Sequence, residues 1–429
     1  MGSFNGISML QLEDKDLLMS PSAPISKRKI PFEEDSQIGD LGKFSLHNVK
    51  SKMRSSIRVV ILSAKISLLM PFGPMAILAD KLFDSHGLVF LFSLLGILPL
   101  AERLGYTTEQ LSCFTGPTVG GLLSATFGNA TELIISIRAL KTGMVRVVQQ
   151  SLLGSILSNL LLVLGCAFFA GGIVIKREQS FNNADASVDF GLLLMAVMGL
   201  LFPAVLHSTE TELEYGESQL SLSRFTSCIM LMGYGSYIVF QLKRQNNLRA
   251  STDEEKGLNE ESLDDVEAPE ISMRESIIWL FILTAWISIL SDYLVNTIEG
   301  ASRESKMPIA FISVILLPVV GNAAEHAGAV MFAVKDKLDI SLGVAVGSSI
   351  QISMFVIPLC VVVGWKIGCP MNLNFELFET CSLFMTVILV AFLLHNGTSN
   401  CLKGLMLIFC YMIVAASFFL HDDYILIEN

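Results

Sequence analysis

Long apolar stretches, separated by short polar segments, follow one another along most of the chain from Val59 onward. A helix needs about 20 predominantly apolar residues to cross a bilayer, whereas a membrane β-barrel would show alternating segments of roughly ten residues. The stretches fit the first pattern, and the sequence predicts eleven membrane-spanning helices. They are expected at residues 57–81, 87–104, 114–140, 146–174, 188–208, 222–243, 275–299, 307–334, 339–366, 376–395 and 402–421.

Two short motifs each occur twice, at one common spacing. GNATEL begins at Gly128 and GNAAEH at Gly321, while GSILSN begins at Gly154 and GSSIQI at Gly347; both pairs are 193 residues apart. A shared offset indicates an internal duplication. Because five helices is an odd number, the second copy enters the membrane from the opposite side, as in many secondary transporters. We predict an all-α membrane protein with one extra N-terminal helix and two inverted five-helix repeats.

The polar segments set the expected domain boundaries. Residues 253–270 hold nine acidic side chains against one lysine, which is typical of a solvated linker. Lysine and arginine are more frequent in the short loops on the side of the N-terminus, so this side is predicted to be cytosolic. The expected division is a cytosolic tail (1–56), a first helix (57–81), a first repeat (87–243), an acidic linker (244–274), a second repeat (275–421) and a C-terminal tail (422–429).

Composition agrees with this class and excludes several functions. The chain of 429 residues is 52% hydrophobic and 16% charged, with a mean hydropathy of +0.60. The net charge of −11 comes without a basic face, which argues against a nucleic-acid partner. The eight cysteines have no CxxC spacing and are interpreted as small core residues. The absence of HExxH and Walker A motifs argues against an intramembrane metalloprotease and an ATP-driven pump. We therefore expect a transporter without a resident cofactor, not an enzyme.

Each copy of the first motif places a carboxylate inside an apolar run, Glu132 in the first and Glu325 in the second. A charged carboxylate at bilayer depth costs about 2.5–3.5 kcal/mol, so such residues need partners or protons. A lone buried glutamate can be purely structural. Duplication at inverted positions favours function, because inverted repeats bring equivalent residues face to face near the bilayer midplane.

The surrounding residues predict a ring of oxygen ligands. Gly128 and Gly321 permit irregular backbone, and Pro318 removes one helix hydrogen bond. Asn129 and Asn322 precede their glutamates by three positions and share the same helix face. Six more residues are either supporting ligands or polar helix-packing residues: Ser155, Ser158, Asn159, Ser348, Ser349 and Gln351.

Oxygen-rich, sulfur-free surroundings suit a hard divalent cation, with Ca²⁺ favoured over Mg²⁺ and with Mn²⁺ also compatible. The same carboxylates can release the cation by binding protons, since burial and a like charge nearby favour the protonated form. An empty, unprotonated site would be too costly to move, so it is expected to move loaded with metal or protons. His326 has two interpretations, a group in proton transfer or a neutral hydrogen-bonded spacer.

Together these motifs, with GPTVGG at Gly116, ERLGYTTEQL at Glu102 and the acidic linker, resemble the vacuolar cation/proton exchangers of the Ca²⁺/cation antiporter superfamily. The likeness runs from about Arg58 to His421. It implies eleven helices, a metal site on the third, fourth, eighth and ninth helices, and proton-driven loading of Ca²⁺ into the vacuole. By the same resemblance, Glu132 and Glu325 are metal- and proton-binding carboxylates, Asn129, Asn322 and Gln351 are polar ligands, and His326 is the second-repeat histidine.

The resemblance also implies a multi-pass protein of the vacuole membrane that uses Ca²⁺ and H⁺ as transported ions. In plant members the N-terminal tail can restrain transport, and residues 1 to about 50, with Lys27, Arg28 and Lys29, are a candidate for that role; a plain solvated tail is the alternative. An oligomer is compatible with the sequence. The runner-up function is a Na⁺-coupled Ca²⁺ exchanger, disfavoured because GSSIQI lacks an aspartate. A cation channel is the alternative from a different class of transport protein. A channel would not need a site that changes sides only with a cation or protons bound.

Overall fold

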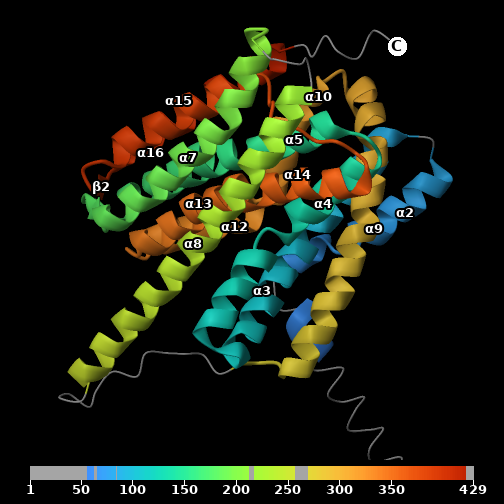
Figure 1. The fold of residues 1–429 in the computed structure, drawn as a ribbon. Coiled ribbons are helices and arrows are strands. Elements are labelled where there is room, and N and C mark those ends of the chain that lie inside the picture. The colour runs from blue at the N-terminus through green and yellow to red at the C-terminus, as the bar shows by residue number, and fades with distance from the viewer. Residues whose placement is uncertain (1–55, 62–64, 84, 212–216, 257–268, 422–429) are drawn as a thin grey trace, which may run out of the picture. The chain divides into compact units, whose positions relative to one another are not determined.

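The computed structural model describes residues 56–61, 65–83, 85–211, 217–256 and 269–421. All of them belong to one compact unit, residues 54–429. Helices dominate this part of the chain, and its two strands, β1 (Gln179–Ser180) and β2 (Thr398–Ser399), form one short antiparallel pair (Figure 1). The predicted regulatory tail, residues 257–268 of the acidic linker and the C-terminal tail lie outside the described residues.

Eight helices in the described part of the chain are long and apolar enough to cross a membrane. A ninth span would come from two helices that meet at a bend of 55° beside Asn322. The structure therefore supports a multi-pass helical membrane protein. The helices of the first half are η1 (Lys65–Leu69), α2 (Phe72–Leu82), α3 (His86–Phe127), α4 (Ala130–Lys141), α5 (Val145–Leu157), η2 (Ser158–Val163), α6 (Leu164–Ile175), α7 (Asn183–Ser208) and α8 (Glu217–Lys256).

The second half begins with α9, the long helix that packs along α3. Most of its spans end within a few residues of the predicted boundaries, because the apolar runs that define a span also define the helix. Its helices are α9 (Met273–Ser305), α10 (Ile309–Phe311), η3 (Ile312–Leu316), α11 (Leu317–Gly321), α12 (Ala323–Val334), α13 (Leu338–Gln351), η4 (Ile352–Val356), α14 (Ile357–Ile367), α15 (Leu377–Leu394) and α16 (Cys401–Leu420).

Three regions differ from the predicted helices. Residues 57–81 are not one continuous helix: residues 56–61 are helical, η1 is a 3₁₀-helix, and α2 starts after Pro71. Pro71 lacks a backbone N–H and cannot continue a helix ladder, which explains why the helix restarts there. At the other end of the half, α8 continues past the predicted boundary at residue 243, because polar residues end a membrane span without ending a helix.

The third difference is a chain reversal inside α3. A Cβ atom built on Gly120 would lie 3.0 Å from the Cβ atom of Ser112. Eight residues of straight α-helix span about 12 Å, so the chain must fold back between these two residues. The predicted spans 87–104 and 114–140 therefore correspond to the two arms of α3, with α4 following the second arm.

Elements in the two halves recur at the spacing of the sequence motifs. The bounds of α4 and α12 differ by 193 residues at both ends, and α5 and α13 begin 193 residues apart. Asn129 and Asn322 precede α4 and α12 with similar backbone angles, φ −109° and −92°. Both halves also contain a π-helix that begins at the end of the second motif, η2 and η4. Single-turn π segments are frequent at functional sites.

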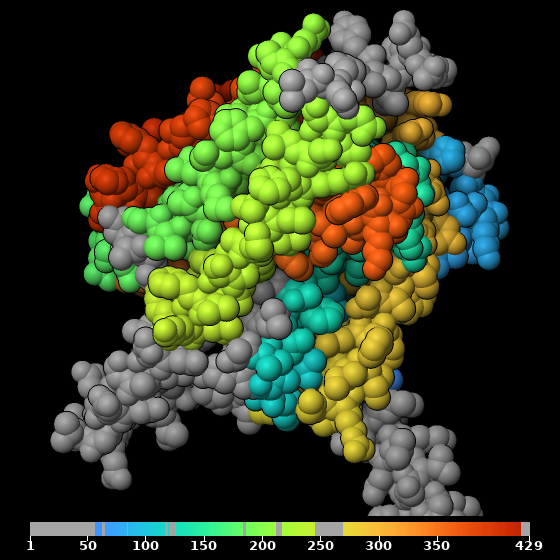
Figure 2. All heavy atoms as spheres, in the orientation of Figure 1, coloured from blue at the N-terminus to red at the C-terminus, as the bar shows by residue number. Residues whose placement is uncertain are grey.

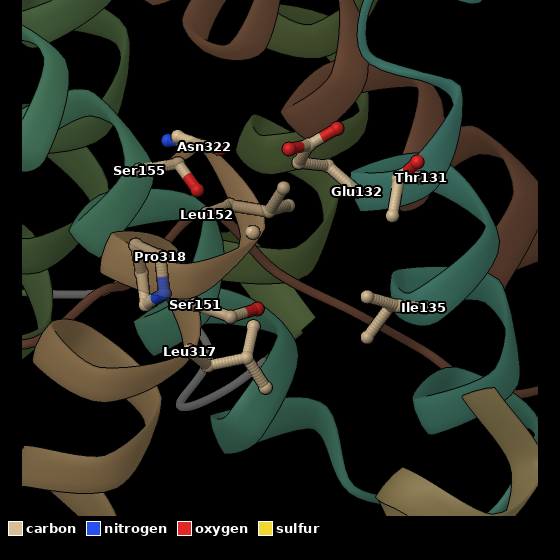
Figure 3. A pocket seen from close by; sticks show the side chains of 10 residues that line it. Thr131, Glu132, Ile135, Ser151, Leu152, Ser155, Leu317, Pro318 and Asn322 are labelled. Carbon is tan, nitrogen blue, oxygen red and sulfur yellow. The ribbon is translucent and has the colours of Figure 1, made fainter. Parts of the chain in front are cut away.

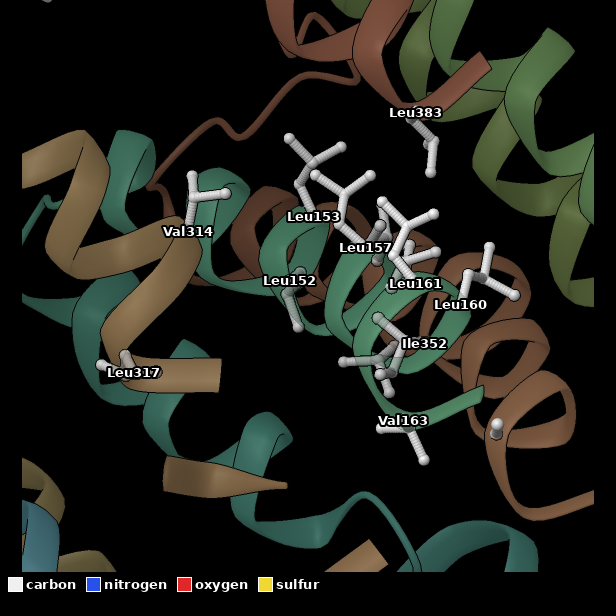
Figure 4. Packing of buried hydrophobic residues seen from close by; sticks show 14 of the residues in the cluster. Leu152, Leu153, Leu157, Leu160, Leu161, Val163, Val314, Leu317, Ile352 and Leu383 are labelled. Atoms are coloured by element: carbon white, nitrogen blue, oxygen red, sulfur yellow. The ribbon is translucent and has the colours of Figure 1, made fainter. Parts of the chain in front are cut away.

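The buried core is centred on α5 and η2. Leu152, Leu153, Leu157 and Leu160 are almost completely buried there and pack with apolar residues of η3, η4 and α15 (Figure 4). Outside this core, α8 crosses one face of the protein beside α14 (Figure 2). The helices with the two motifs are thus enclosed by other helices, which keeps their polar residues away from lipid.

Candidate cation site

Both predicted carboxylates lie in the first turn of a helix that follows a short interruption of the preceding helix. Glu132 follows Asn129 at the start of α4, and Glu325 follows Asn322 at the start of α12. Free backbone N–H groups and the helix dipole favour negative charge at such a position. The breaks that the sequence predicted near Gly128 and Gly321 therefore place each glutamate at a helix N-terminus.

Asn159 joins the two halves at the centre of the site. Its Nδ2 atom donates to Glu325 Oε2 at 3.2 Å and to Ser348 Oγ at 3.0 Å. Its Oδ1 atom accepts a hydrogen bond from Asn322 Nδ2 at 3.4 Å. Asn159 is fully buried, as a polar side chain with this many partners can be. One amide of the first half therefore holds three polar residues of the second half.

A second set of hydrogen bonds runs through Asn129. Its Nδ2 atom donates to Gln351 Oε1 at 2.5 Å, and its Oδ1 atom accepts from Ser348 Oγ at 3.1 Å. Ser348 Oγ also lies 3.3 Å from Glu325 Oε1. The two sets share Ser348 and form one network that reaches Glu325 on both of its carboxylate oxygens.

Glu132 borders a small cavity of about 20 Å³ beside this network. Its carboxylate faces Ser155 and Asn322 across the cavity, and Gly321 completes the wall (Figure 3). A cavity of this size holds about one water-sized occupant. Asn322, which lines the same cavity, donates to Asn159 and so links the cavity to the network that holds Glu325. The structure thus brings the two predicted carboxylates to one place.

The other predicted residues fall into two groups. Ser158 Oγ lies 3.2 Å from His326 Nε2, so these two residues meet beside the network. Ser349, in contrast, donates its hydroxyl to Ala345 O of its own helix at 2.9 Å. Gly128 is exposed and lies with Asn129 in the break between α3 and α4. Ser349 therefore has the helix-packing role that was the alternative for this set.

Several residues that line the Glu132 cavity were not predicted as ligands, among them Thr131, Ser151 and Pro318. Ser151 precedes Ser155 by four positions and so shares its helix face, a spacing that could have identified it. Thr131 is adjacent to Glu132, and no pattern in the sequence marked it as a site residue. Pro318 was noted only for its missing N–H. The cavity wall is therefore wider than the duplicated motifs.

The site is rich in oxygen atoms: two carboxylates, the side-chain carbonyls of four amides and several hydroxyls. Ca²⁺ takes six to eight oxygen ligands at about 2.3–2.6 Å and tolerates a mixed, flexible cage. The described part of the chain has no cluster of three or more His, Cys, Asp or Glu side chains. Neutral oxygens would therefore supply most ligands, and the two carboxylates would supply the charge.

The two halves differ in how tightly their equivalent glycines are packed. A Cβ atom on Gly154 in α5 would lie 2.7 Å from the Cα atom of Val314 in η3 and would overlap its carbonyl. A Cβ atom on Gly347, the equivalent residue in α13, would have no neighbour within 4 Å among the described side chains and backbone. Among the described residues, the helix backbone is therefore packed more tightly at Gly154 than at Gly347.

Comparison with known proteins gives consistent results. The pattern of the family "Sodium/calcium exchanger protein" matches residues 85–243 and 275–420. The chain is 61% identical to vacuolar cation/proton exchanger 5 of Arabidopsis thaliana, over 99% of this chain and 95% of the relative. It is 62% identical to vacuolar cation/proton exchanger 2 of Oryza sativa subsp. japonica, over 97% of both. The solved structure of the selenium-substituted Ca²⁺/H⁺ antiporter protein YfkE is similar, with a TM-score of 0.68, 34% identity, and coverage of 83% of this chain and 99% of that one.

Proposed function

Because the chain belongs to the sodium/calcium exchanger protein family, we propose that it is a secondary active antiporter that exchanges Ca²⁺ for H⁺ at Glu132 and Glu325. The resemblance to vacuolar cation/proton exchangers that the motifs indicated is confirmed by the two plant relatives. The observation that carries the proposal is the shared network, in which Asn159 of one half holds Glu325 of the other. The activity is transport, with Ca²⁺ and H⁺ as cargo; Mn²⁺ is a further candidate cargo on the chemistry of the ligands.

Charge balance explains why such a site exchanges one ion for the other. Two carboxylates carry the charge that one divalent cation or two protons would neutralise. With neither bound, two like charges would be enclosed among apolar helices, a state that low dielectric makes costly. The site therefore changes sides only when it is loaded, and the leak state is suppressed.

The driving force favours more than one proton for each Ca²⁺. A difference of one pH unit supplies ~1.4 kcal/mol per proton, and a tenfold Ca²⁺ gradient costs ~1.4 kcal/mol. One proton across two pH units could then oppose only about a hundredfold Ca²⁺ gradient before voltage is counted. Two protonated carboxylates would double this capacity.

The packing of Gly154 and Gly347 supports alternating access. If the two halves are inverted repeats, the contact between Gly154 and Val314 has a counterpart between Gly347 and residue 121, which is also a glycine. The first contact is made, whereas no atom of the described residues lies within 4 Å of a Cβ atom on Gly347. If the contact at Gly154 separated and the counterpart contact at Gly347 formed, the site would open to the opposite side of the membrane.

The repeat architecture and location are part of the same proposal. Matching element bounds and the repeated π segments support inverted repeats. The second arm of α3 with α4, and the broken first helix, would bring the nine spans to eleven. The names of the plant relatives support the vacuole membrane. Together with the excess of Lys and Arg on one side, they support a cytosolic N-terminus and Ca²⁺ loading into the vacuole.

Flux into sealed vesicles tests the proposed function. We expect ⁴⁵Ca²⁺ uptake by acid-loaded vesicles that contain the protein, and its loss when a protonophore collapses the pH gradient. Replacing Na⁺ by K⁺ addresses the Na⁺-coupled alternative within the same family and should leave uptake unchanged. Uptake that persists without a pH gradient and requires Na⁺ would favour that alternative.

A further inference from the structure

A second polar cavity, separate from the cation site, lies between α7, α8 and α13. It has a volume of about 290 Å³, and five of its lining residues are polar: Asn182, Asp189, Gln241, Arg244 and Asp339. They lie near the start of α7, near the start of α13 and at the end of the apolar part of α8. Under the orientation proposed above these positions lie at the cytosolic end.

The volume argues against a single metal ion as occupant. A water-sized particle needs about 10–15 Å³ of such space, whereas pockets for small molecules begin near 300 Å³. The cavity therefore fits a ligand of many atoms. Charged groups come from all three helices, so the ligand would contact each of them.

The charges in the cavity have both signs, with the negative sign in excess. Asp189 Oδ1 accepts from Tyr237 Oη at 2.9 Å, and Asp339 Oδ1 accepts from the backbone N–H of Asn182 at 2.8 Å. These bonds fix two carboxylates from different helices at the wall of a cavity that Arg244 also lines. Such a wall suits a ligand with an ammonium group and a phosphate, and it disfavours a ligand with net negative charge.

The surface around the cavity indicates that the ligand also has an apolar part. Each of the three helices exposes a large apolar side chain close in sequence to the cavity: Val188 at 43%, Phe240 at 50% and Ile340 at 45%. On membrane helices, exposed side chains of this kind contact acyl chains. A molecule with an ammonium-phosphate head and acyl chains would match both surfaces.

We propose that the cavity between α7, α8 and α13 binds the headgroup of an aminophospholipid such as phosphatidylethanolamine. The ammonium lies against Asp189 and Asp339, and the phosphate lies near Arg244. The acyl chains run along Val188, Phe240 and Ile340. Because α13 also carries Ser348 and Gln351 of the cation site, the bound lipid joins a site-bearing helix to two outer helices.

Native mass spectrometry of the purified full-length protein tests this site independently of transport. Phosphatidylethanolamine, phosphatidylcholine and phosphatidylglycerol with identical acyl chains are added at equal concentrations. We expect phosphatidylethanolamine to be retained best, since its ammonium donates hydrogen bonds to carboxylates, and phosphatidylglycerol least. Equal retention of phosphatidylglycerol overturns the proposal.

Charge-removing variants locate the lipid. Asp189→Asn and Asp339→Asn keep the oxygens that accept from Tyr237 and Asn182, so the fold is retained, and each should lower retention about fivefold. Glu178→Gln, which removes an exposed carboxylate at the same end of the molecule, is the matched control and should have no effect. Unchanged binding in both aspartate variants overturns the proposal. Competition by free phosphoethanolamine at equal concentration would assign the site to a soluble ligand and overturn the lipid.

Discussion

The side-chain amide of Asn159 donates to a carboxylate oxygen of Glu325 across 3.2 Å, and thereby connects the two halves of the chain at the cation site. The same amide donates to Ser348, and its carbonyl accepts from Asn322. Sequence reasoning included Asn159 only as one of several supporting residues. In the structure it is the residue with the most contacts to the opposite half of the site.

Replacing this amide tests its role. Asn159→Ala removes the donor to Glu325 and Ser348 and the acceptor for Asn322, so the carboxylate loses its orientation. Loss of a residue that orients a metal ligand typically costs 10–100-fold in metal affinity, and we expect a rise of about that size in the Ca²⁺ concentration for half-maximal uptake. Ser349→Ala, which removes a hydroxyl engaged within its own helix, is the control. Equal effects of the two substitutions would contradict the assignment.

The two carboxylates are tested by removing their charge. Glu132→Gln and Glu325→Gln each leave one carboxylate, which can neither balance a divalent cation nor carry two protons. Proton-driven ⁴⁵Ca²⁺ uptake is expected to disappear in both, while the protein is still found in the membrane. Glu217→Gln, at an exposed carboxylate in the first turn of α8, should retain full uptake. Full activity in either site variant would refute the site.

The sequence predicted the spans better than their irregularities. Apolar length determines where a helix crosses, and the prediction at 402–421 differs from α16 by one residue at each end. Interruptions depend on local chemistry that hydropathy does not measure. Pro71 divides the first predicted helix, and α8 continues as a polar helix beyond its apolar run.

The site was predicted from repetition, but its contacts were not. The common offset identified both glutamates and both asparagines of the first motif. The offset could not identify which helices pack against each other. Helix packing determines that Asn159 donates to Glu325 of the other half, whereas Ser349 donates to Ala345 of its own helix. Pairing across the two halves is a property of helix packing, and the motifs carry no information about it.

The glycine pair tests alternating access. Gly154→Ala would push α5 away from Val314, so we expect lower thermal stability together with lower uptake. Gly347→Ala meets no atom of the described residues within 4 Å in this conformation and should leave thermal unfolding unchanged. It should slow transport because the opposite conformation needs the same close approach. Gly343→Ala, also in open space, is the control. Wild-type uptake in Gly347→Ala would contradict the reciprocal contact.

A polar contact at the end of α12 gives a pH-dependent prediction. Two hydrogen bonds, one from Gln179 with the larger effect and one from Arg177, hold the pKa of Asp336 below its ordinary value of 3.8. A lowered pKa in the folded state stabilises the fold at pH values above the ordinary pKa, and this contribution is lost as the pH falls through the lowered pKa. Asp336→Asn should therefore lower the unfolding temperature at pH 7, and the difference from the wild type should shrink below pH 4. A difference that is constant across this range would exclude the ionised carboxylate as its cause.

The ion pair between Arg146 in α5 and Glu379 in α15 tests a buried charge away from the cation site. The guanidinium lies 2.7 Å from Glu379 Oε1 and 3.5 Å from Glu376 Oε1, and the Glu379 side chain is only 1% exposed. Gln150 Nε2 also donates to Glu379 Oε1 at 3.1 Å.

Removing Arg146 leaves a buried carboxylate without its cation, which typically costs about 3–5 kcal/mol, whereas removing both charges is often close to neutral. We expect Arg146→Gln to lower the unfolding temperature sharply and the double variant Arg146→Gln/Glu379→Gln to recover most of the loss. Arg138→Gln, which removes a cation whose partner Asp292 is 44% exposed, should have a smaller effect that Asp292→Asn does not reverse. Additive effects of the Arg146 and Glu379 substitutions would show that the two charges do not stabilise each other, because coupled charges give a double variant that is more stable than the sum predicts.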